Sequence, residues 1–245
     1  MAINRQAFES ELSRVFKLNG LGSLLDKRRS ELFFLLTERM LTENEKYNLT
    51  AITDPEKIIL NHYADCAQLS AKLPKGAKII DVGCGAGFPT LPLAIVREDV
   101  SILAMDSTAK RIGYVNETAE MLGLKNVTAI AMRAEDGAKQ PEYREKFDYA
   151  TARAVAEMRV LCELCLPYVK VGGEMLAMKG KNAEYELSGA KRAISLLGGA
   201  DVVVESVSLV GGAEEFTHPI IRVKKKAKTP PTYPRPYAQI SKKPL

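Results

Sequence analysis

The sequence predicts an α/β protein with a doubly wound, mostly parallel sheet of seven strands and a helical extension at the N-terminus. Strand and helix patterns alternate from Lys78 onward, a glycine-rich turn follows the first strand, and no strand pattern precedes it. With 245 residues, 46% of them apolar, the chain can bury a substantial core. We expect a helical region over 1–72, a sheet domain over 73–223 and a basic tail over 224–245.

The first region is expected to be helical from about residue 5. Phe8, Leu12 and Val15 recur at helical spacing, and residues 32–40 form a long apolar stretch between Arg and Glu. A Pro- and Gly-containing break at 72–76 ends the region.

Seven strands and four main helices are expected after this break. The expected strands are 78–82, 100–106, 127–132, 147–151, 174–178, 201–210 and 218–223, and the expected helices are 89–97, 108–122, 157–168 and 183–197. A short connection at Gly211-Gly212 joins the last two strands, which predicts one antiparallel strand beside parallel neighbours.

The turn after the first strand predicts a nucleotide-cofactor site. Gly83, Gly85 and Gly87 alternate, so the backbone can turn sharply, approach a ligand and present the N–H groups of the next helix. A dinucleotide fingerprint needs its third glycine one position later, where Phe88 stands. The alternative is a tight turn without a ligand.

Residues that end the next two strands are expected to contact the cofactor. Asp106 lies about 20 residues after the first glycine, where a carboxylate accepts bonds from ribose hydroxyls. It could instead cap the next helix, but Ser107 and Thr108 are suited to that. Ala134 and Glu135 could meet an adenine or begin a short helix.

Basic residues lie at the ends of the fourth and fifth expected strands. Arg153 interrupts an apolar stretch, which is costly unless its guanidinium meets a carboxylate, a carbonyl or a phosphate. Lys179 and Lys181 follow the fifth strand at the same edge of the sheet.

Charge is segregated along the chain. After Glu215 there are eight basic residues and no acidic one, although the whole chain carries only +5. The Lys- and Pro-rich tail is expected to be extended, and such a one-signed segment favours RNA or DNA as a partner. A tail that is merely solvated is the alternative.

The cysteines and the apolar pattern indicate a reduced, cytoplasmic protein. No apolar run reaches the roughly 20 residues of a membrane span, and a signal-peptide pattern is absent. Cys162 and Cys165 are spaced as neighbours on one face of a helix, and the sequence has no closely spaced pair of histidines that could complete a metal site with them. We therefore expect both to be core residues and expect no metal site.

Several segments together resemble the RsmG family, also called glucose-inhibited division protein B, of bacterial methyltransferases. These segments are residues 47–52, 62–66, 83–89, 106–111, 133–135, 153–155, 179–181, 233–235 and 242–245. Cys66 stands where the family usually has serine, and Pro236-Tyr237 departs from the usual tail. The resemblance implies a class I methyltransferase fold, S-adenosylmethionine as cofactor, and guanine N7 of small-subunit (16S) ribosomal RNA as substrate.

The resemblance and the residues together define the expected site. Expected cofactor contacts are Gly83, Gly85, Gly87, Phe88, Asp106, Ser107, Ala134, Glu135 and Arg153. Expected RNA contacts are Arg133, Lys179, Lys181, Arg235, Lys242 and Lys243. Guanine N7 has an exposed lone pair, so alignment can supply catalysis without a general base. Arg153, Lys179 and His62 are expected to have positioning roles, although His62 could be purely structural.

Two other functions stay open from the residues. One is a methyltransferase for a small metabolite or a protein, which the basic tail disfavours. The other is a cofactor-binding RNA module or assembly factor without turnover. We expect a monomer.

Overall fold

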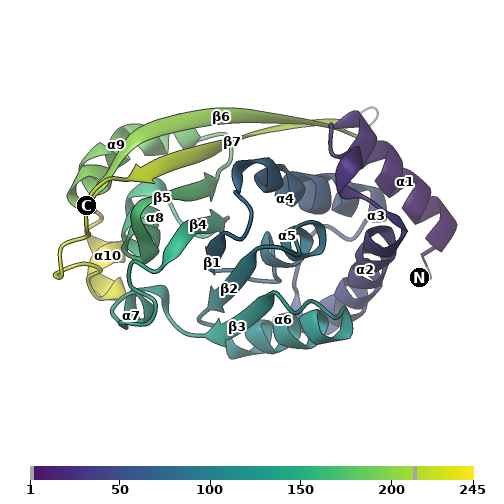
Figure 1. Ribbon diagram of the computed structural model, residues 1–245, viewed down its shortest axis with the longest axis horizontal. Coiled ribbons are helices and arrows are strands. Elements are labelled where there is room, and N and C mark those ends of the chain that lie inside the picture. The colour runs from purple at the N-terminus through teal and green to yellow at the C-terminus, as the bar shows by residue number, and fades with distance from the viewer. Residues whose placement is uncertain (1–2, 212–213) are drawn as a thin grey trace.

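A seven-stranded sheet runs through the middle of the molecule (Figure 1). The computed structural model describes residues 3–211 and 214–245. The sheet order is β3-β2-β1-β4-β5-β7-β6. The strands are β1 (Lys78–Val82), β2 (Ser101–Asp106), β3 (Val127–Ala131), β4 (Phe147–Arg153), β5 (Val169–Met178), β6 (Gly199–Gly211) and β7 (Glu214–Lys225).

The predicted topology is confirmed. Strands β1 to β5 pair in parallel, and β7 pairs antiparallel with both β5 and β6. The last two strands are longer than predicted and form a ribbon that reaches α1 (Arg5–Leu18) (Figure 1). Of the predicted connection at Gly211-Gly212, Gly212 lies outside the described residues.

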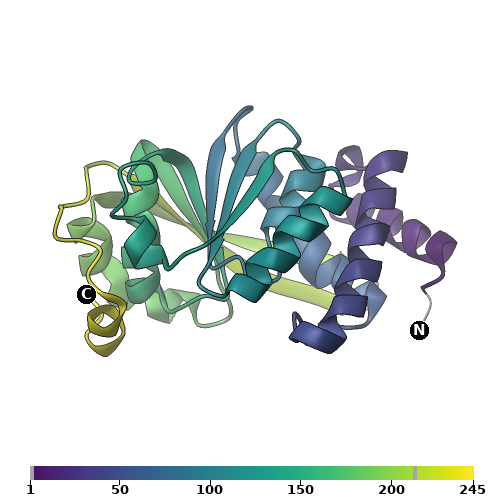
Figure 2. The same ribbon diagram turned by 90° about the horizontal axis from the view of Figure 1, so that it is seen from below.

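Alternate residues of the central strands pack on opposite faces of the sheet. Ile79 belongs to the core under α2 (Lys27–Tyr47), α5 (Thr90–Val96) and α6 (Ala109–Met121). Ile80 belongs to the core under α8 (Met158–Cys165) and α9 (Ala183–Leu196). Figure 2 shows helices on both faces. Since both faces are covered, the strands read as continuous apolar runs.

The N-terminal helices share one hydrophobic core with the sheet. Phe16 and Phe33 are fully buried in the same cluster as Ile79. The side chain of Asn19 exchanges hydrogen bonds with the backbone of Val210, which ties α1 to β6. Shorter turns complete this region, namely α3 (Pro55–Ile58), a π-helical turn at Ile59–Ala64, α4 (Asp65–Ala67) and 3-10 turns at Gly22–Leu24 and Gln68–Lys72.

The C-terminal segment, residues 226–245, folds back along the molecule, so the expectation of a fully extended tail is wrong. It contains α10 (Tyr237–Lys242), and Ile240 of that helix is completely buried against the α8 face. A strand that continues to Lys225 precedes it. Within the described part of the chain, none of the helices combines the length and the hydropathy that a membrane crossing requires.

Candidate active site

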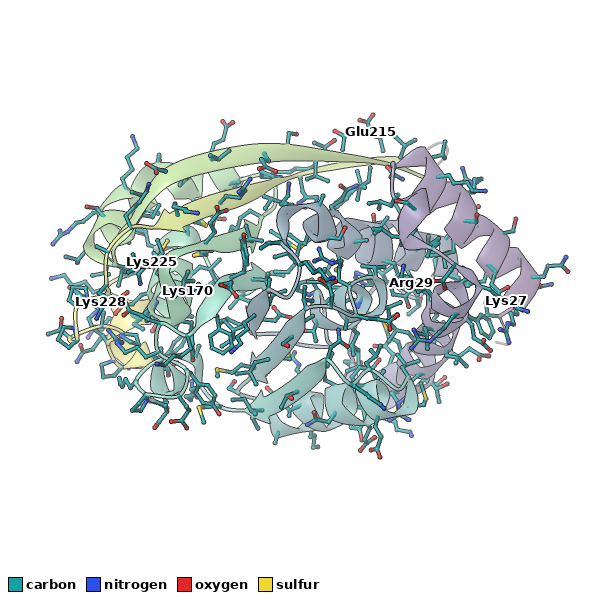
Figure 3. All side chains as sticks on the ribbon, viewed as in Figure 1. Lys27, Arg29, Lys170, Glu215, Lys225 and Lys228 are labelled. Carbon is teal, nitrogen blue, oxygen red and sulfur yellow. The ribbon has the colours of Figure 1, made fainter. Side chains whose placement is uncertain are left out.

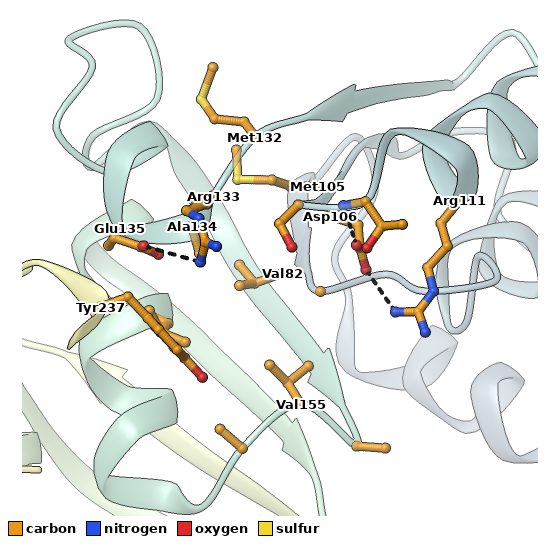
Figure 4. Close-up of a pocket in the computed structure, with 16 residues that line it drawn as sticks. Val82, Met105, Asp106, Arg111, Met132, Arg133, Ala134, Glu135, Val155 and Tyr237 are labelled. Carbon is orange, nitrogen blue, oxygen red and sulfur yellow. Dashed lines mark hydrogen bonds and ion pairs between the residues drawn. The ribbon is translucent and has the colours of Figure 1, made fainter. Parts of the chain in front are cut away.

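A cavity of about 300 Å³ lies where the carboxyl ends of β1, β2, β3 and β4 meet (Figure 4). Five of the nine residues predicted to bind a cofactor line it: Gly83, Asp106, Ser107, Ala134 and Glu135. Parallel strands end at one edge of a sheet, which is why residues far apart in the sequence converge here. That these side chains contact a cofactor remains a prediction.

Asp106 organises the glycine turn as well as facing the cavity. Its two carboxylate oxygens accept hydrogen bonds from the backbone N–H groups of Gly85, at 3.1 Å, and Thr108, at 2.8 Å. The Thr108 side chain forms no capping bond, so Asp106 also performs the role that we expected of its neighbours. A carboxylate has about four acceptor sites. Asp106 therefore keeps capacity for a pair of hydroxyl groups.

The Ala134-Glu135 corner forms the short helix that we gave as one of its two alternatives, and its contact with an adenine stays a prediction. Ala134 begins α7 (Ala134–Gly137), and its carbonyl accepts a 2.6 Å hydrogen bond from the hydroxyl of Tyr168. Glu135 is buried, and its carboxylate lies 3.8 Å from the Arg133 guanidinium. The corner is thus held rigidly beside the cavity.

Four predicted cofactor residues do not line this cavity: Gly85, Gly87, Phe88 and Arg153. The Phe88 ring stacks on His62 at a centroid distance of 4.5 Å, and the Arg153 guanidinium lies 5.3 Å from the same ring. Gly85 acts through its backbone bond to Asp106. The sequence showed that Arg153 needs a partner but not which partner.

That partner is the N-terminal helical region. The guanidinium donates to the Asn61 carbonyl and the Asp65 carboxylate, both at 3.0 Å, and to Nδ1 of His62 at 2.9 Å. Arg153 thus joins the end of β4 to the π-helical turn, and its contact with the cofactor stays a prediction. Sequence reasoning did not identify Asp65 as the partner of Arg153.

His62 is neutral in this arrangement. Burial, aided by the Arg153 charge, lowers its pKa to about 4. Nδ1 lies 2.9 Å from the Arg153 guanidinium and 3.1 Å from the Asn61 carbonyl, and Nε2 lies 3.0 Å from the Thr50 hydroxyl. Neither ring nitrogen is free, and the positioning role of His62 stays a prediction.

A second cavity of about 560 Å³ adjoins the first and shares Ala154 with it. Its walls include the side chains of His62, Asp65, Arg153, Lys179, Lys181, Phe216 and His218. Nε2 of the buried His218 lies 2.5 Å from the second oxygen of Asp65. The sequence predicts no site role for His218. It predicts the strand that contains His218 but not the pairing of His218 with Asp65, because the two residues lie far apart in the sequence.

The two lysines that line this cavity differ in exposure and in their partners. Lys179 is mostly buried and donates to the Ala156 carbonyl at 2.7 Å and to Glu186 at 2.6 Å. Its predicted RNA contact is therefore corrected, because it holds α9 and the 154–156 loop instead. Lys181 is exposed and has no ion-pair partner in residues 3–211 and 214–245.

Most of the basic end is neutralised by acids from other parts of the fold. Arg222 and Lys224 pair with Glu174, Lys226 pairs with Asp201, and Arg235 pairs with the fully buried Glu163. Lys225 is completely buried, unlike the nearby Lys228, which is exposed (Figure 3). The predicted phosphate contact of Arg235 is corrected accordingly.

Several of the residues that we expect to contact RNA are exposed basic residues. Lys242 and Lys243 have no ion-pair partner among the described residues. Arg133 is mostly exposed and lines the first cavity. These three residues and Lys181 retain the RNA role as a prediction.

The prediction that Cys162 and Cys165 are core residues is confirmed. All four thiols are free and buried, and burial raises the pKa of each, for Cys162 to about 12. Such thiols are poor nucleophiles and metal ligands at neutral pH. Among the described residues, no group of three or more His, Cys, Asp or Glu could hold a metal ion.

The polar groups that line the first cavity suit S-adenosylmethionine. A buried carboxylate with spare acceptor capacity faces it at Asp106, and a second lies at Glu135. Its volume is at the lower end of the range for small-molecule sites. These carboxylates can accept hydrogen bonds from the hydroxyl, amine and ammonium groups of such a ligand, beside Arg111 at 3.6 Å from Asp106 and Arg133 at 3.8 Å from Glu135.

Comparison with known proteins identifies the family. The model of a family described as rRNA small subunit methyltransferase G matches residues 29–215. The chain belongs to this family. It is thus a methyltransferase that uses S-adenosylmethionine.

Curated relatives span nearly the whole chain. A ribosomal RNA small subunit methyltransferase G from Clostridium perfringens is 48% identical over 86% of this chain and 89% of its own length. A relative of the same name from Lactobacillus delbrueckii subsp. bulgaricus is 41% identical over 99% of this chain and its own full length.

Solved structures support the fold. An S-adenosylmethionine-dependent O-methyltransferase from Thermotoga maritima covers 78% of this chain and 72% of its own, with 15% identity and a TM-score of 0.53. A precorrin-6y C5,15-methyltransferase from Geobacter metallireducens covers 75% of this chain and 96% of its own, with 16% identity and a TM-score of 0.52. The predicted class I methyltransferase fold is confirmed.

Proposed function

We propose that this chain transfers the methyl group of S-adenosylmethionine to N7 of a guanine in small-subunit ribosomal RNA. The observation that carries the proposal is the second cavity, which meets the cofactor cavity at Ala154. It is lined by aromatic rings and by a free lysine, which suit a base and its phosphate. The names of the relatives supply the class of RNA.

The bonding of the second cavity supports N7 as the acceptor. An exocyclic amine must lose a proton, whereas N7 presents a lone pair. Both nitrogens of His62 form hydrogen bonds with protein groups, and one oxygen of Asp65 accepts from Arg153. The other Asp65 oxygen lies 2.5 Å from Nε2 of the buried His218. Glu215, which also lines the cavity, is exposed to solvent. His62 is therefore not free to remove a proton, which favours an acceptor that needs no deprotonation.

Positioning then has to supply the rate enhancement. The cofactor provides an electrophilic methyl group on a sulfonium centre. The Arg153 bonds hold the end of β4 beside Ala154, where the two cavities meet, and Lys179 fixes the adjoining loop. Lys181 is placed to bind a phosphate beside the base. Holding two reactants in line lowers the barrier because their orientational entropy is lost on binding.

Identification of the methylated nucleoside tests the proposal. Purified protein is incubated with S-adenosylmethionine labelled in the methyl group and with small-subunit RNA, intact small subunits or large-subunit RNA. Nucleosides are then separated and identified by mass spectrometry. We expect labelled 7-methylguanosine from small-subunit material only, and no label with Asp106→Ala. A different methylated nucleoside, or equal labelling of large-subunit RNA, would contradict the proposal.

We also infer a cytoplasmic monomer. Ribosomal RNA is a cytoplasmic substrate, which supports this location. Light scattering on the purified protein measures the oligomeric state.

A further inference from the structure

The C-terminal segment returns to the cofactor cavity. Tyr237, the first residue of α10, lines it opposite Asp106 (Figure 4). The other described lining residues all lie between Val82 and Leu164. The segment that the sequence suggested as an RNA-binding tail thus contributes a wall of the small-molecule site.

Buried bonds hold this segment in place. The Arg235 guanidinium and backbone N–H donate four hydrogen bonds to Glu163, between 2.6 and 3.2 Å, and Glu163 is fully buried in α8. The Arg144 guanidinium donates to the carbonyls of Thr229, Pro230 and Tyr233 within 3.1 Å. Charge-assisted bonds to a buried carboxylate are among the strongest in proteins. The entry to α10 is therefore rigid.

The Arg133 guanidinium also contacts the Tyr237 ring and helps to orient it. The Arg133 guanidinium lies 5.9 Å from its centroid and 3.8 Å from the Glu135 carboxylate. Arg133 thus links the ring to the corner where we expect the adenine. Tyr237 is 42% exposed and lines the cofactor cavity. Adenine is a suitable partner for the ring, because every nucleobase can stack on an aromatic face.

We propose that Tyr237, positioned by Arg133 and by the Arg235–Glu163 pair, stacks against the adenosyl part of S-adenosylmethionine. The C-terminal segment is thereby a structural part of the cofactor site. This inference rests on use of the cofactor and does not depend on the RNA substrate. It concerns a residue at which the chain departs from the tail that its relatives led us to expect.

Calorimetric titration without RNA tests the inference, with S-adenosylmethionine and 5′-methylthioadenosine as ligands. We expect Tyr237→Ala to weaken both ligands equally, by about fivefold to tenfold, because a partly exposed ring supplies the lower end of stacking energies. Tyr237→Phe should stay within about twofold, since it keeps the ring. The matched control is Tyr185→Ala on α9, whose ring is 83% exposed and lines neither cavity.

Each other result overturns the inference. Unchanged affinity in folded Tyr237→Ala would remove Tyr237 from the site. A loss for S-adenosylmethionine alone would move the ring to the amino-acid end of the ligand. A loss in Tyr237→Phe as large as in Tyr237→Ala would assign the effect to the hydroxyl group.

A double-mutant cycle tests whether the Arg235–Glu163 ion pair acts through Tyr237. The variant Glu163→Gln/Arg235→Gln removes the ion pair without leaving a charge buried alone. If the pair acts by positioning Tyr237, the loss of S-adenosylmethionine affinity in this variant should largely disappear when Tyr237 is already alanine. Fully additive losses of affinity would show that the ion pair acts on the site by another route.

Discussion

At the scale of single residues, the site depends on groups whose partners neutralise or orient them. Arg153 is tolerated in the interior because Asp65 and the Asn61 carbonyl receive its guanidinium. Burial, aided by the Arg153 charge, keeps His62 neutral by lowering its pKa. Since a buried charge without a partner is costly, these residues stabilise the boundary between the two cavities as a unit.

The neutral state of His62 makes stability depend on pH. Its pKa is about 4 in the folded protein and near 6.5 in the unfolded chain, so the unfolded state binds more protons between these values. Its contribution is fully present above pH 6.5 and is lost as pH falls toward 4. We expect the stability advantage of the wild type over His62→Gln to shrink by up to about 3 kcal/mol across this window.

Urea unfolding of both proteins at several pH values between 4 and 7.5 measures this difference. Using the difference removes the contributions of other titrating groups, such as Asp81, whose pKa is raised to about 6 by burial. A constant difference over the window would contradict the assignment of a neutral, buried His62.

At the scale of elements, the glycine turn shows how backbone conformation places a side chain. Gly85 has a φ of +54°, and its N–H donates to Asp106. A Cβ added at Gly85 would meet nothing within 4 Å, so steric collision with the protein is not the issue. The positive φ and the bond to the carboxylate explain the need for glycine.

We expect Gly85→Val to weaken S-adenosylmethionine binding by more than tenfold, because a β-branched residue disfavours this φ and shifts the N–H away from Asp106. Gly123→Val is the matched control. Gly123 also has a positive φ, +67°, and open space at its Cβ, but it follows α6 and does not line the cofactor cavity. Calorimetry should show a loss only for Gly85→Val, and equal losses would contradict a local role of the turn.

At the scale of the whole molecule, folding redistributes charge. The basic end is largely paired with acids of the sheet domain, so the free cations are fewer than the sequence indicates. Lys181, Lys242 and Lys243 stay exposed and without ion-pair partners in the described residues. They are the candidates for phosphate contacts.

Substitution of these three lysines by alanine should weaken RNA binding and flatten its salt dependence. Each lost phosphate contact reduces the slope of log Kd against log salt by up to about one unit. The control replaces Lys27, Lys75 and Lys125, which are also exposed and unpaired in the described chain but line neither of the two adjoining cavities. Filter binding of RNA at several salt concentrations measures the slope for both variants. An equal change of slope in the two variants would show that RNA binds without preference for Lys181, Lys242 and Lys243.

The sequence by itself determined the sheet and one side of the site. Alternating strand and helix patterns predict a doubly wound, mostly parallel sheet, because parallel strands need helical crossovers. The Gly83 turn and Asp106 are predicted as site residues because they end adjacent strands. These features depend on local periodicity and on spacing along the chain.

Only the tertiary structure decided the partners of the charged residues. Arg153 meets Asp65, Arg235 meets Glu163, and Tyr237 reaches the cofactor cavity through contacts between segments that are far apart in the sequence. A single sequence shows that a buried charge needs a counter-charge but not which one. That choice depends on how the N-terminal helices, the antiparallel β7 and the C-terminal segment pack on the sheet.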